Sequence, residues 1–308
     1  MDVTGSRVVV TGGAGFVGSH LAERLAEEAA VAVVDDLSAG RREWVPDDAS
    51  FHEGDLTDPA VLDRVIDPDV DLVCHLAAAK AVDAAAPRRQ FETNLEATYN
   101  VLERMDAVGV DRLLYTSSST VYGEAPRPTP EDYGPLEPIS AYGAGKLAEE
   151  GLVSTYAHSH GIQSWVLRFA NIVGPRLRGA VVPDFVEKLR EDPDRLVILG
   201  DGRQEKSYMH VTDCVDAMCH VLASADERFN VYNLGTETTT SVDDIAGIVA
   251  DVMGLDPTFE HTGGDRGWTG DVPRMRLDVE KLASLGWSPT LESDEAIERA
   301  AKELLAEL

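Results

Sequence analysis

A glycine-rich turn between an apolar strand and a helix constrains the fold of this chain more than any other segment. Residues 8–10 are all valine, and glycines follow at Gly12, Gly15 and Gly18. Gly12 allows a tight turn, Gly15 lets the backbone approach a pyrophosphate, and Gly18 lets the helix lie close to the strand. The helix N-terminus would present free N–H groups and the positive end of its dipole to the phosphates. The segment therefore predicts a dinucleotide-binding site.

A second apolar run, at residues 31–34, ends in two acidic residues, Asp35 and Asp36. A carboxylate at this place accepts hydrogen bonds from the adenosine ribose and repels a 2′-phosphate, which favours NAD over NADP. Arg41 and Arg42 follow closely and leave NADP open as an alternative. A solvated loop acid is the other interpretation of Asp35, and the strand, turn and helix that precede it favour binding.

The 308 residues are enough for one large core or two joined cores. Strands and helices alternate regularly over the first half, which predicts an α/β, Rossmann-type doubly wound parallel sheet. Proline and glycine are denser in the second half, which indicates a smaller substrate-binding lobe. We expect an NAD-binding domain at residues 1–170 plus about 207–234, and a substrate-binding lobe at 171–206 and 235–308.

Composition restricts the partners. The chain carries 55 acidic and 27 basic residues, a formal charge of −28, which opposes contact with nucleic acid or anionic membranes. The acids are scattered, as in proteins from salt-loving archaea, where ionic strength screens their repulsion. Cys74, Cys214 and Cys219 have no metal-ligand spacing and indicate reduced thiols. The cysteine spacing therefore predicts no metal site. Reduced thiols, and the absence of any apolar run that approaches about 18 residues, predict a cytoplasmic protein.

The remaining periodicity predicts further elements, and the strand ends carry more candidate cofactor contacts. Strands are expected at 51–56, 70–76, 112–116, 165–169, 196–199 and 231–234, and helices at 90–107, 141–158, 212–223 and 242–253. Asp55 and Leu56 leave the third strand, where Asp55 would face the adenine. Leu76, Ala77 and Ala78 end the fourth strand, where small side chains let a cofactor lie against the backbone, although an alanine run also suits a helix. The expected cofactor contacts also include Phe16, Val17 and Phe169.

Tyr142 and Lys146 lie one turn apart on one face of the helix predicted at 141–158. A free tyrosine titrates near 10, so it is a base at neutral pH only where positive charge stabilises the phenolate. Lys146 and the nicotinamide ring of NAD would both supply that charge. Tyr-x-x-x-Lys alone is common on helix surfaces, but its place downstream of the glycine turn indicates an active site.

Residues 116–123, TSSSTVYG, follow the fifth predicted strand. Their hydroxyls would emerge at the carboxyl edge of the sheet, where substrates bind in open α/β folds. One hydroxyl can bridge Tyr142 and the reacting oxygen. We expect Ser117 and Ser119 instead to bond nearby backbone.

Together, TGGAGFVG, the strand-end aspartate, HLAAAKAV, SSSTVYG, YGAGK and RFANIVGPR resemble the extended short-chain dehydrogenase/reductase family. Within it, the chain is similar over nearly its whole length to nucleotide-sugar epimerases of the UDP-glucose 4-epimerase type. The resemblance implies that Tyr142 is the base, that Lys146 binds the nicotinamide ribose and tunes Tyr142, and that Ser118 polarises the sugar oxygen. Thr120 is the second choice for that hydroxyl.

The resemblance also implies roles outside the central motif. Lys80 would lie near the cofactor phosphates, and Asn94 and Asn171 would shape the floor of the site, with Asn171 toward the sugar nucleotide. The helices at 90–107 and 141–158 resemble those that pair in dimers of the family, which implies a homodimer.

The implied reaction is epimerisation of a UDP-sugar, with UDP-glucose and UDP-galactose as the leading pair. Tyr142 takes the proton of the C4 hydroxyl while NAD accepts the C4 hydride, and the 4-keto sugar then receives hydride on its other face. Relatives that dehydrate or decarboxylate usually carry an acid just after the catalytic hydroxyl, whereas this chain has Ser119 and Thr120. Alternatives are epimerisation of UDP-glucuronate or a UDP-N-acetylhexosamine, a dehydratase or reductase, and a non-catalytic NAD-binding regulator.

A diphosphate needs cations, and this chain has few. Lys206 and Arg266 are the expected ligands in the substrate lobe, with Arg176 and Arg178 as alternatives. Lys206 stands where many relatives have arginine, and lysine is a point charge without the bidentate fork.

Overall fold

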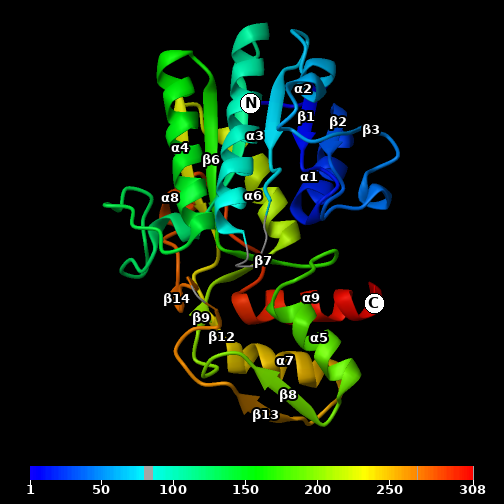
Figure 1. The fold of residues 1–308 in the computed structure, drawn as a ribbon, viewed down its shortest axis with the longest axis vertical. Helices are drawn as coiled ribbons and strands as arrows, with labels where there is room; N and C mark the ends of the chain where they lie inside the picture. Colours follow the sequence, from blue (N-terminus) through cyan, green and yellow to red (C-terminus); the bar gives the residue numbers. More distant parts are fainter. Residues whose placement is uncertain (80–85, 269, 308) are drawn as a thin grey trace. The chain divides into compact units, whose positions relative to one another are not determined.

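The computed structural model describes residues 1–79, 86–268 and 270–307 (Figure 1). Its internal contacts divide the chain into two compact units. Unit 1 comprises Met1–Val121, Ala141–Arg168 and Met218–Tyr232. Unit 2 comprises Tyr122–Ser140, Phe169–Ala217 and Asn233–Leu308. Each helix in the described part of the chain is too short or too polar to cross a lipid bilayer.

The largest sheet in the described residues has seven strands in the order β11-β6-β5-β4-β1-β2-β3. The strands are β1 (Arg7–Thr11), β2 (Ala30–Asp35), β3 (Ser50–Glu53), β4 (Leu72–His75), β5 (Arg112–Ser118), β6 (Gln163–Phe169) and β11 (Phe229–Leu234). β1 pairs in parallel with β2 on one side and with β4 on the other, so the strand order reverses beside β1. Ligands of doubly wound sheets bind outside the carboxyl ends of the strands at such a reversal. The predicted Rossmann-type fold is confirmed.

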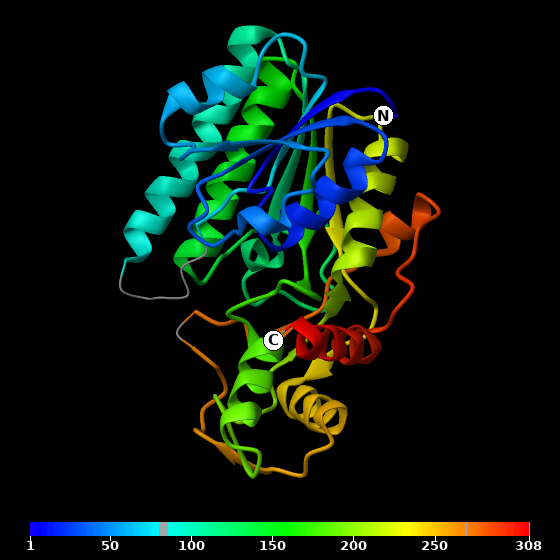
Figure 2. The same cartoon turned by 90° about the vertical axis from the view of Figure 1, so that its right-hand side faces the viewer.

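Helices cover the sheet because its strands are apolar on both faces. They are α1 (Phe16–Ala26), α2 (Pro59–Val65), α3 (Pro87–Val108), α4 (Ala141–Ser159) and α6 (Val211–Ser224). Val9, Val34 and Val73 belong to a core cluster with residues of α2, α3 and α4. Side chains alternate along a strand, so Val8 and Val10 face the other way, toward the side on which α1 lies (Figure 2).

The glycine turn has the close contacts that the sequence predicts. Gly12 has a positive φ of 69°, and a Cβ there would lie 2.6 Å from the backbone nitrogen of Ala77. A Cβ on Gly18 would lie 2.1 Å from the carbonyl oxygen of Gly12. The first turn of α1 therefore packs directly on the turn that follows β1.

Alanine should have opposite effects at two helical glycines. Gly18→Ala forces the turn to shift and is expected to lower the free energy of unfolding by about 1–3 kcal/mol. Gly151→Ala is the matched control, because Gly151 is exposed within α4 with nothing within 4 Å of an added Cβ. That change should raise stability by about 1 kcal/mol through helix propensity. Urea unfolding measures both, and equal effects would contradict the packing described for Gly18.

Unit 2 is built from short strands and further helices. Its elements are η2 (Ser119–Tyr122, whose last residue lies in this unit), β7 (Asn171–Val173), α5 (Val181–Glu191), β8 (Arg195–Ile198), β9 (Glu205–Lys206), β10 (Tyr208–His210), β12 (Thr240–Ser241), α7 (Val242–Met253), β13 (Thr258–His261), β14 (Arg274–Met275), α8 (Glu280–Ser284) and α9 (Ser293–Glu307). The described residues of this unit form three small sheets, with the strand orders β10-β7, β12-β9-β14 and β13-β8.

Most predicted elements of the first half are present with small shifts. The strand expected at 51–56 ends at Glu53, and the one expected at 70–76 is β4, Leu72–His75. Residues 77–79 form a loop, so the alternative of an alanine helix is wrong there. The helix expected at 90–107 begins earlier, because Pro87 starts α3.

The two units differ from the expected lobes in two segments. Residues 122–140 belong to unit 2, where the Tyr122 hydroxyl donates to Asn233 Oδ1 at 2.8 Å. Residues 207–217 also belong to unit 2, where Asp213 accepts hydrogen bonds from the backbone of Thr290 and Leu291. Both segments make these contacts with residues that are distant in sequence.

Candidate active site

The start of α1 fits a dinucleotide phosphate. Gly15 is the N-cap of this helix, and no side chain in the described residues caps it. The first N–H groups of a helix need acceptors, and a phosphate supplies them. Phe16 and Val17, two expected cofactor contacts, form the first turn beyond Gly15.

Asp35 ends β2 and braces the glycine turn. Its carboxylate accepts from the backbone N–H of Ala14 at 3.0 Å and of Leu37 at 2.8 Å. Burial raises the pKa of Asp35, and the two backbone hydrogen bonds act in the opposite direction. A carboxylate has about four acceptor positions, so these bonds are compatible with a ribose hydroxyl on the same group. Asp36 is exposed and accepts from Ser38, within its own loop.

The alternative cofactor ligands Arg41 and Arg42 both have protein partners. Arg41 pairs with Glu43 at 3.3 Å, and Arg42 lies 4.7 Å above the ring of Phe51.

The other expected cofactor contacts lie at strand ends, with varied partners. Asp55 is exposed and accepts from the backbone of Thr57, whereas Leu56 packs in the main core. The remaining residues of this group are Leu76 and Ala77, which donate to Thr11, Ala78 in the same loop, and Phe169 at the end of β6. Lys80 lies outside the described residues.

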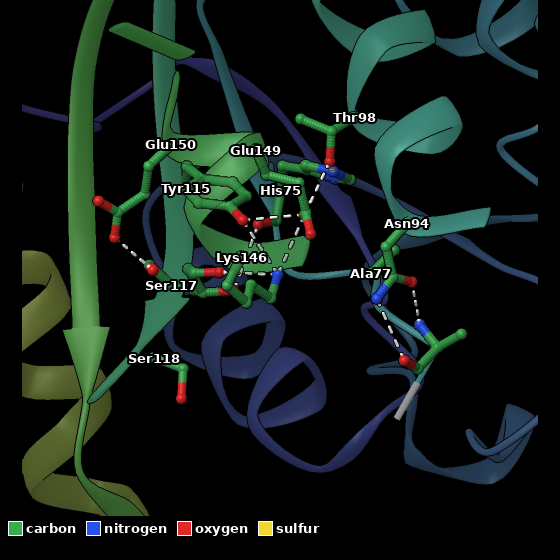
Figure 3. Close-up of polar contacts among 12 residues, drawn as sticks. His75, Ala77, Asn94, Thr98, Tyr115, Ser117, Ser118, Lys146, Glu149 and Glu150 are labelled. Carbon is green, nitrogen blue, oxygen red and sulfur yellow. Dashed lines mark hydrogen bonds and ion pairs between the residues drawn. The ribbon is translucent and has the colours of Figure 1, made fainter. Parts of the chain in front are cut away.

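Asn94 holds the loop that follows β4. Its Oδ1 accepts from the backbone N–H of Ala79 at 2.7 Å, and its Nδ2 donates to the carbonyl of Ala79 at 3.2 Å (Figure 3). Gln90 donates to the same carbonyl at 2.9 Å. Two buried amides of α3 therefore fix the backbone at the carboxyl end of β4.

The two candidate hydroxyls are bonded to each other. Ser118 is the last residue of β5, and Thr120 follows in η2. The Thr120 hydroxyl donates to Ser118 Oγ at 3.0 Å, and the Thr120 N–H donates to it at 3.2 Å. Because Ser118 accepts both bonds, it can direct its own hydrogen to a third group. This arrangement suits Ser118 as the donor, with Thr120 supporting it.

Tyr142 and Lys146 occupy the first two turns of α4. Lys146 Nζ lies 6.0 Å from the centre of the Tyr142 ring. Burial raises the pKa of Tyr142, Lys146 lowers it, and Glu149 raises it further, with a net upward shift. The effect expected from Lys146 is therefore present, but burial outweighs it.

Lys146 is also part of a buried polar network that the sequence analysis missed (Figure 3). Its ammonium pairs with Glu149 at 3.3 Å, and the two side chains are only 3% and 1% exposed. The network continues from Glu149 to Thr98, from Thr98 to His75 at 3.0 Å, and from His75 to Thr11 at 2.7 Å. Glu149 lies three residues beyond Lys146 on the same helix face, which is the signal that could have identified it.

A second buried ion pair lies beside the first. Arg168 of β6 binds Glu150 of α4 through two hydrogen bonds, of 2.9 and 2.7 Å, in the bidentate arrangement. Ser117 donates to Glu150 at 2.5 Å. The expectation that Ser117 bonds backbone is therefore wrong, because the carboxylate of Glu150 points at β5.

In unit 2, Lys206 and Arg266 meet at one residue. Lys206 Nζ lies 2.5 Å from the buried carboxylate of Asp271, and Arg266 donates to the carbonyl of Asp271 at 2.6 Å. Arg266 also pairs with Glu124. Lys206 lies 5.1 Å from the ring centre of Trp268. Asp271 therefore contacts both residues that are expected to bind the diphosphate.

The alternative cations lie elsewhere in unit 2. The Arg176 backbone donates to Glu307 at 2.9 Å, and Arg178 pairs with the same carboxylate at 3.4 Å. Both therefore contact the end of α9. Asn171 starts β7 and donates to the carbonyl of Ser207 at 3.3 Å.

Comparison with known proteins gives consistent matches over the whole chain. A family model described as the NAD dependent epimerase/dehydratase family matches residues 8–235. A putative UDP-glucose 4-epimerase from Methanocaldococcus jannaschii is 31% identical, covering 95% of this chain and 96% of the relative.

Solved structures match over a similar share of the chain. A UDP-galactose 4-epimerase structure has a TM-score of 0.90 and 43% identity, covering 98% of this chain and 99% of its own. A UDP-glucose 4-epimerase from Thermus thermophilus, in complex with NAD, has a TM-score of 0.87 and 33% identity, covering 98% and 100%. A UDP-N-acetylglucosamine 4-epimerase from Methanobrevibacter ruminantium has a TM-score of 0.89 and 26% identity, covering 99% and 100%.

Proposed function

Since this chain belongs to the NAD dependent epimerase/dehydratase family, we propose that it is a nucleotide-sugar 4-epimerase that interconverts UDP-glucose and UDP-galactose. The observation that carries the proposal is that Tyr142 and Lys146 lie on the first turns of α4 and that Lys146 donates to the carbonyl of Thr116 on β5, the strand that ends at Ser118. Unit 1 binds NAD in this proposal, and unit 2 binds the nucleotide of the substrate.

The residues divide the chemistry between them. Tyr142 takes the proton of the 4-hydroxyl and later returns it, while Ser118 donates a hydrogen bond to the same oxygen. Lys146 supplies positive charge that favours the phenolate. NAD, when bound, accepts the C4 hydride and gives it back.

The residues after Ser118 favour epimerisation over dehydration. Expulsion of the C6 hydroxyl needs an acid close to it. Ser119 and Thr120 stand at these positions, and neither is a carboxylic acid.

Lys206 and Arg266 bind the diphosphate in this proposal. Both are held at Asp271, which places two cations together in a strongly acidic chain. A diphosphate would replace carboxylate partners with stronger anionic acceptors.

Lys206→Gln should therefore weaken substrate binding. We expect KM for the UDP-sugar to rise about tenfold with kcat within about twofold, because the lost contact is the same in ground and transition states. Lys188→Gln is the matched control, since Lys188 pairs with Asp184 at 2.6 Å on α5. Steady-state kinetics measure KM and kcat of both variants, and equal KM values would contradict the role of Lys206 in binding the diphosphate.

We further propose a homodimer formed through α3 and α4. Tyr99 of α3 is 42% exposed and meets Tyr156 of α4 edge to face, with ring centres 6.3 Å apart. Exposed aromatic side chains of this kind are enriched at interfaces. We also propose a cytoplasmic location, which the free cysteines at 74, 214 and 219 support, and activity at high salt, which the charge of −28 favours.

A panel of UDP- and dTDP-sugars tests the proposal. The purified protein is incubated with each sugar without added NAD, and products are identified by chromatography. We expect UDP-glucose and UDP-galactose to interconvert. Conversion confined to UDP-glucuronate or to UDP-N-acetylhexosamines would reassign the substrate, and a 4-keto-6-deoxy product would show a dehydratase.

A further inference from the structure

The Lys146 ammonium has three polar partners in a buried position. Nζ lies 3.2 Å from the Tyr115 hydroxyl, 3.1 Å from the carbonyl of Thr116 and 3.3 Å from Glu149 Oε2. An ammonium has three N–H donors, so these partners fix its position. Of the three, only Glu149 carries a full charge.

Glu149 is itself held from three elements. Its Oε2 accepts from Thr98 of α3 at 2.9 Å, from Tyr115 of β5 at 2.9 Å and from Lys146 of α4. Its Oε1 is buried and has no hydrogen-bond partner among the described residues. The carboxylate is thus fixed in a buried position, where charges act on each other more strongly than in water.

Glu149 and Lys146 have opposite effects on the pKa of Tyr142. Lys146 lowers the pKa of this phenol, whereas Glu149 raises it. The other titratable groups facing this cluster contribute little net charge. Burial raises the pKa of Tyr115 and lowers that of His75 to about 3, so both are neutral near pH 7, and the nearby Glu150 is paired with Arg168.

We propose that Glu149 is a positioning residue of the active site: its carboxylate holds the Lys146 ammonium in place and offsets part of its charge, so that Glu149 sets the pH range in which Tyr142 loses its proton. The inference rests on the proposed function for the role of Tyr142. A phenol that must both take and return a proton works best when it titrates near the operating pH. Burial and Glu149 both raise the pKa of Tyr142, so Glu149 limits how much phenolate forms near neutral pH.

Titration of the Tyr142 phenol tests this directly. Ultraviolet difference spectra are recorded against pH for the NAD-loaded protein without sugar, and the spectrum of Tyr142→Phe in the same background is subtracted. Glu149→Gln keeps the shape and removes the charge. We expect the titration midpoint of Tyr142 in this variant to fall by about one pH unit. At a pH well below the midpoint, that shift gives about tenfold more phenolate. The acid limb of kcat/KM should move by the same amount.

Two further variants separate charge from packing. Tyr115→Phe removes hydroxyl contacts to Lys146 and Glu149 without changing charge, and its midpoint should stay within about half a unit of wild type. Glu149→Asp keeps the charge on a shorter side chain and should lower the midpoint by less than Glu149→Gln. If Glu149→Gln does not fold, Glu149→Met, which also removes the charge, decides.

The outcomes are distinguishable from failure of the proposed function. An unchanged or higher midpoint in Glu149→Gln, or in Glu149→Met when it decides, overturns the inference, as does an equal shift in Tyr115→Phe. The titration needs no sugar substrate. A downward shift in a protein that epimerises no nucleotide sugar would therefore support the role of Glu149 and reject only the proposed activity.

Discussion

Tyr142→Phe is expected to lower kcat for epimerisation by about a thousandfold while leaving the fold intact. The substitution removes one oxygen, and with it the group that takes and returns the proton of the 4-hydroxyl. Ser118 can still donate a hydrogen bond to the substrate, but it does not replace the tyrosine phenolate that the charge of Lys146 favours. Product formation from UDP-galactose measures the loss, and thermal unfolding and the amount of bound NAD verify the fold.

Tyr156→Phe is the matched control for this prediction. It makes the same change at the far end of α4, where the Tyr156 ring stacks on His160 with centres 4.5 Å apart. Its kcat should stay within about twofold of wild type. A Tyr142→Phe enzyme that keeps more than about a tenth of wild-type kcat would rule out Tyr142 as the acid and base.

Arg168→Met is expected to lower the free energy of unfolding by about 3–5 kcal/mol. Arg168 and Glu150 are only 6% and 7% exposed, so the substitution leaves a buried carboxylate without its cation. Urea unfolding measures the loss. The exposed pair of Arg24 and Glu28 at 3.0 Å is the control, and Arg24→Met should cost less than about 1 kcal/mol.

The double variant Arg168→Met with Glu150→Leu sharpens the prediction. Replacing both members of a buried pair by apolar residues removes the desolvation cost together with the attraction. We expect the double variant to recover most of the stability lost in Arg168→Met. A double variant less stable than Arg168→Met would show that the cost comes from lost packing and not from the unpaired charge.

The local signals of the first half made its fold predictable. The strands around the glycine turn are nearly continuous apolar runs, and the turn chemistry lies within a few residues of them. Gly12 and Gly18 have the contacts expected of the turn. In unit 2, the helix predicted at 242–253 is present with the same bounds as α7. Ser118, Tyr142 and Lys146 could be predicted as site residues because their motifs follow the glycine turn in a recognisable order along the chain.

Contacts between distant segments could not be predicted in the same way. The strands of unit 2 have two to four residues, which is too few for a periodic signal. The sequence analysis also did not predict helices α5 and α9. Lys206 and Arg266 meet only because Asp271 lies between them in space. The partners of Glu149 come from α3, β5 and α4, so its role depends on tertiary packing.

The most direct test of the account uses UDP-glucose that carries deuterium at C4. The substrate is incubated with the purified protein in ordinary water, and the UDP-galactose formed is analysed by mass spectrometry. If Tyr142 removes only the hydroxyl proton and the C4 hydride goes to resident NAD and back, the product keeps its deuterium. UDP-galactose that has exchanged this deuterium for hydrogen from water would contradict the account.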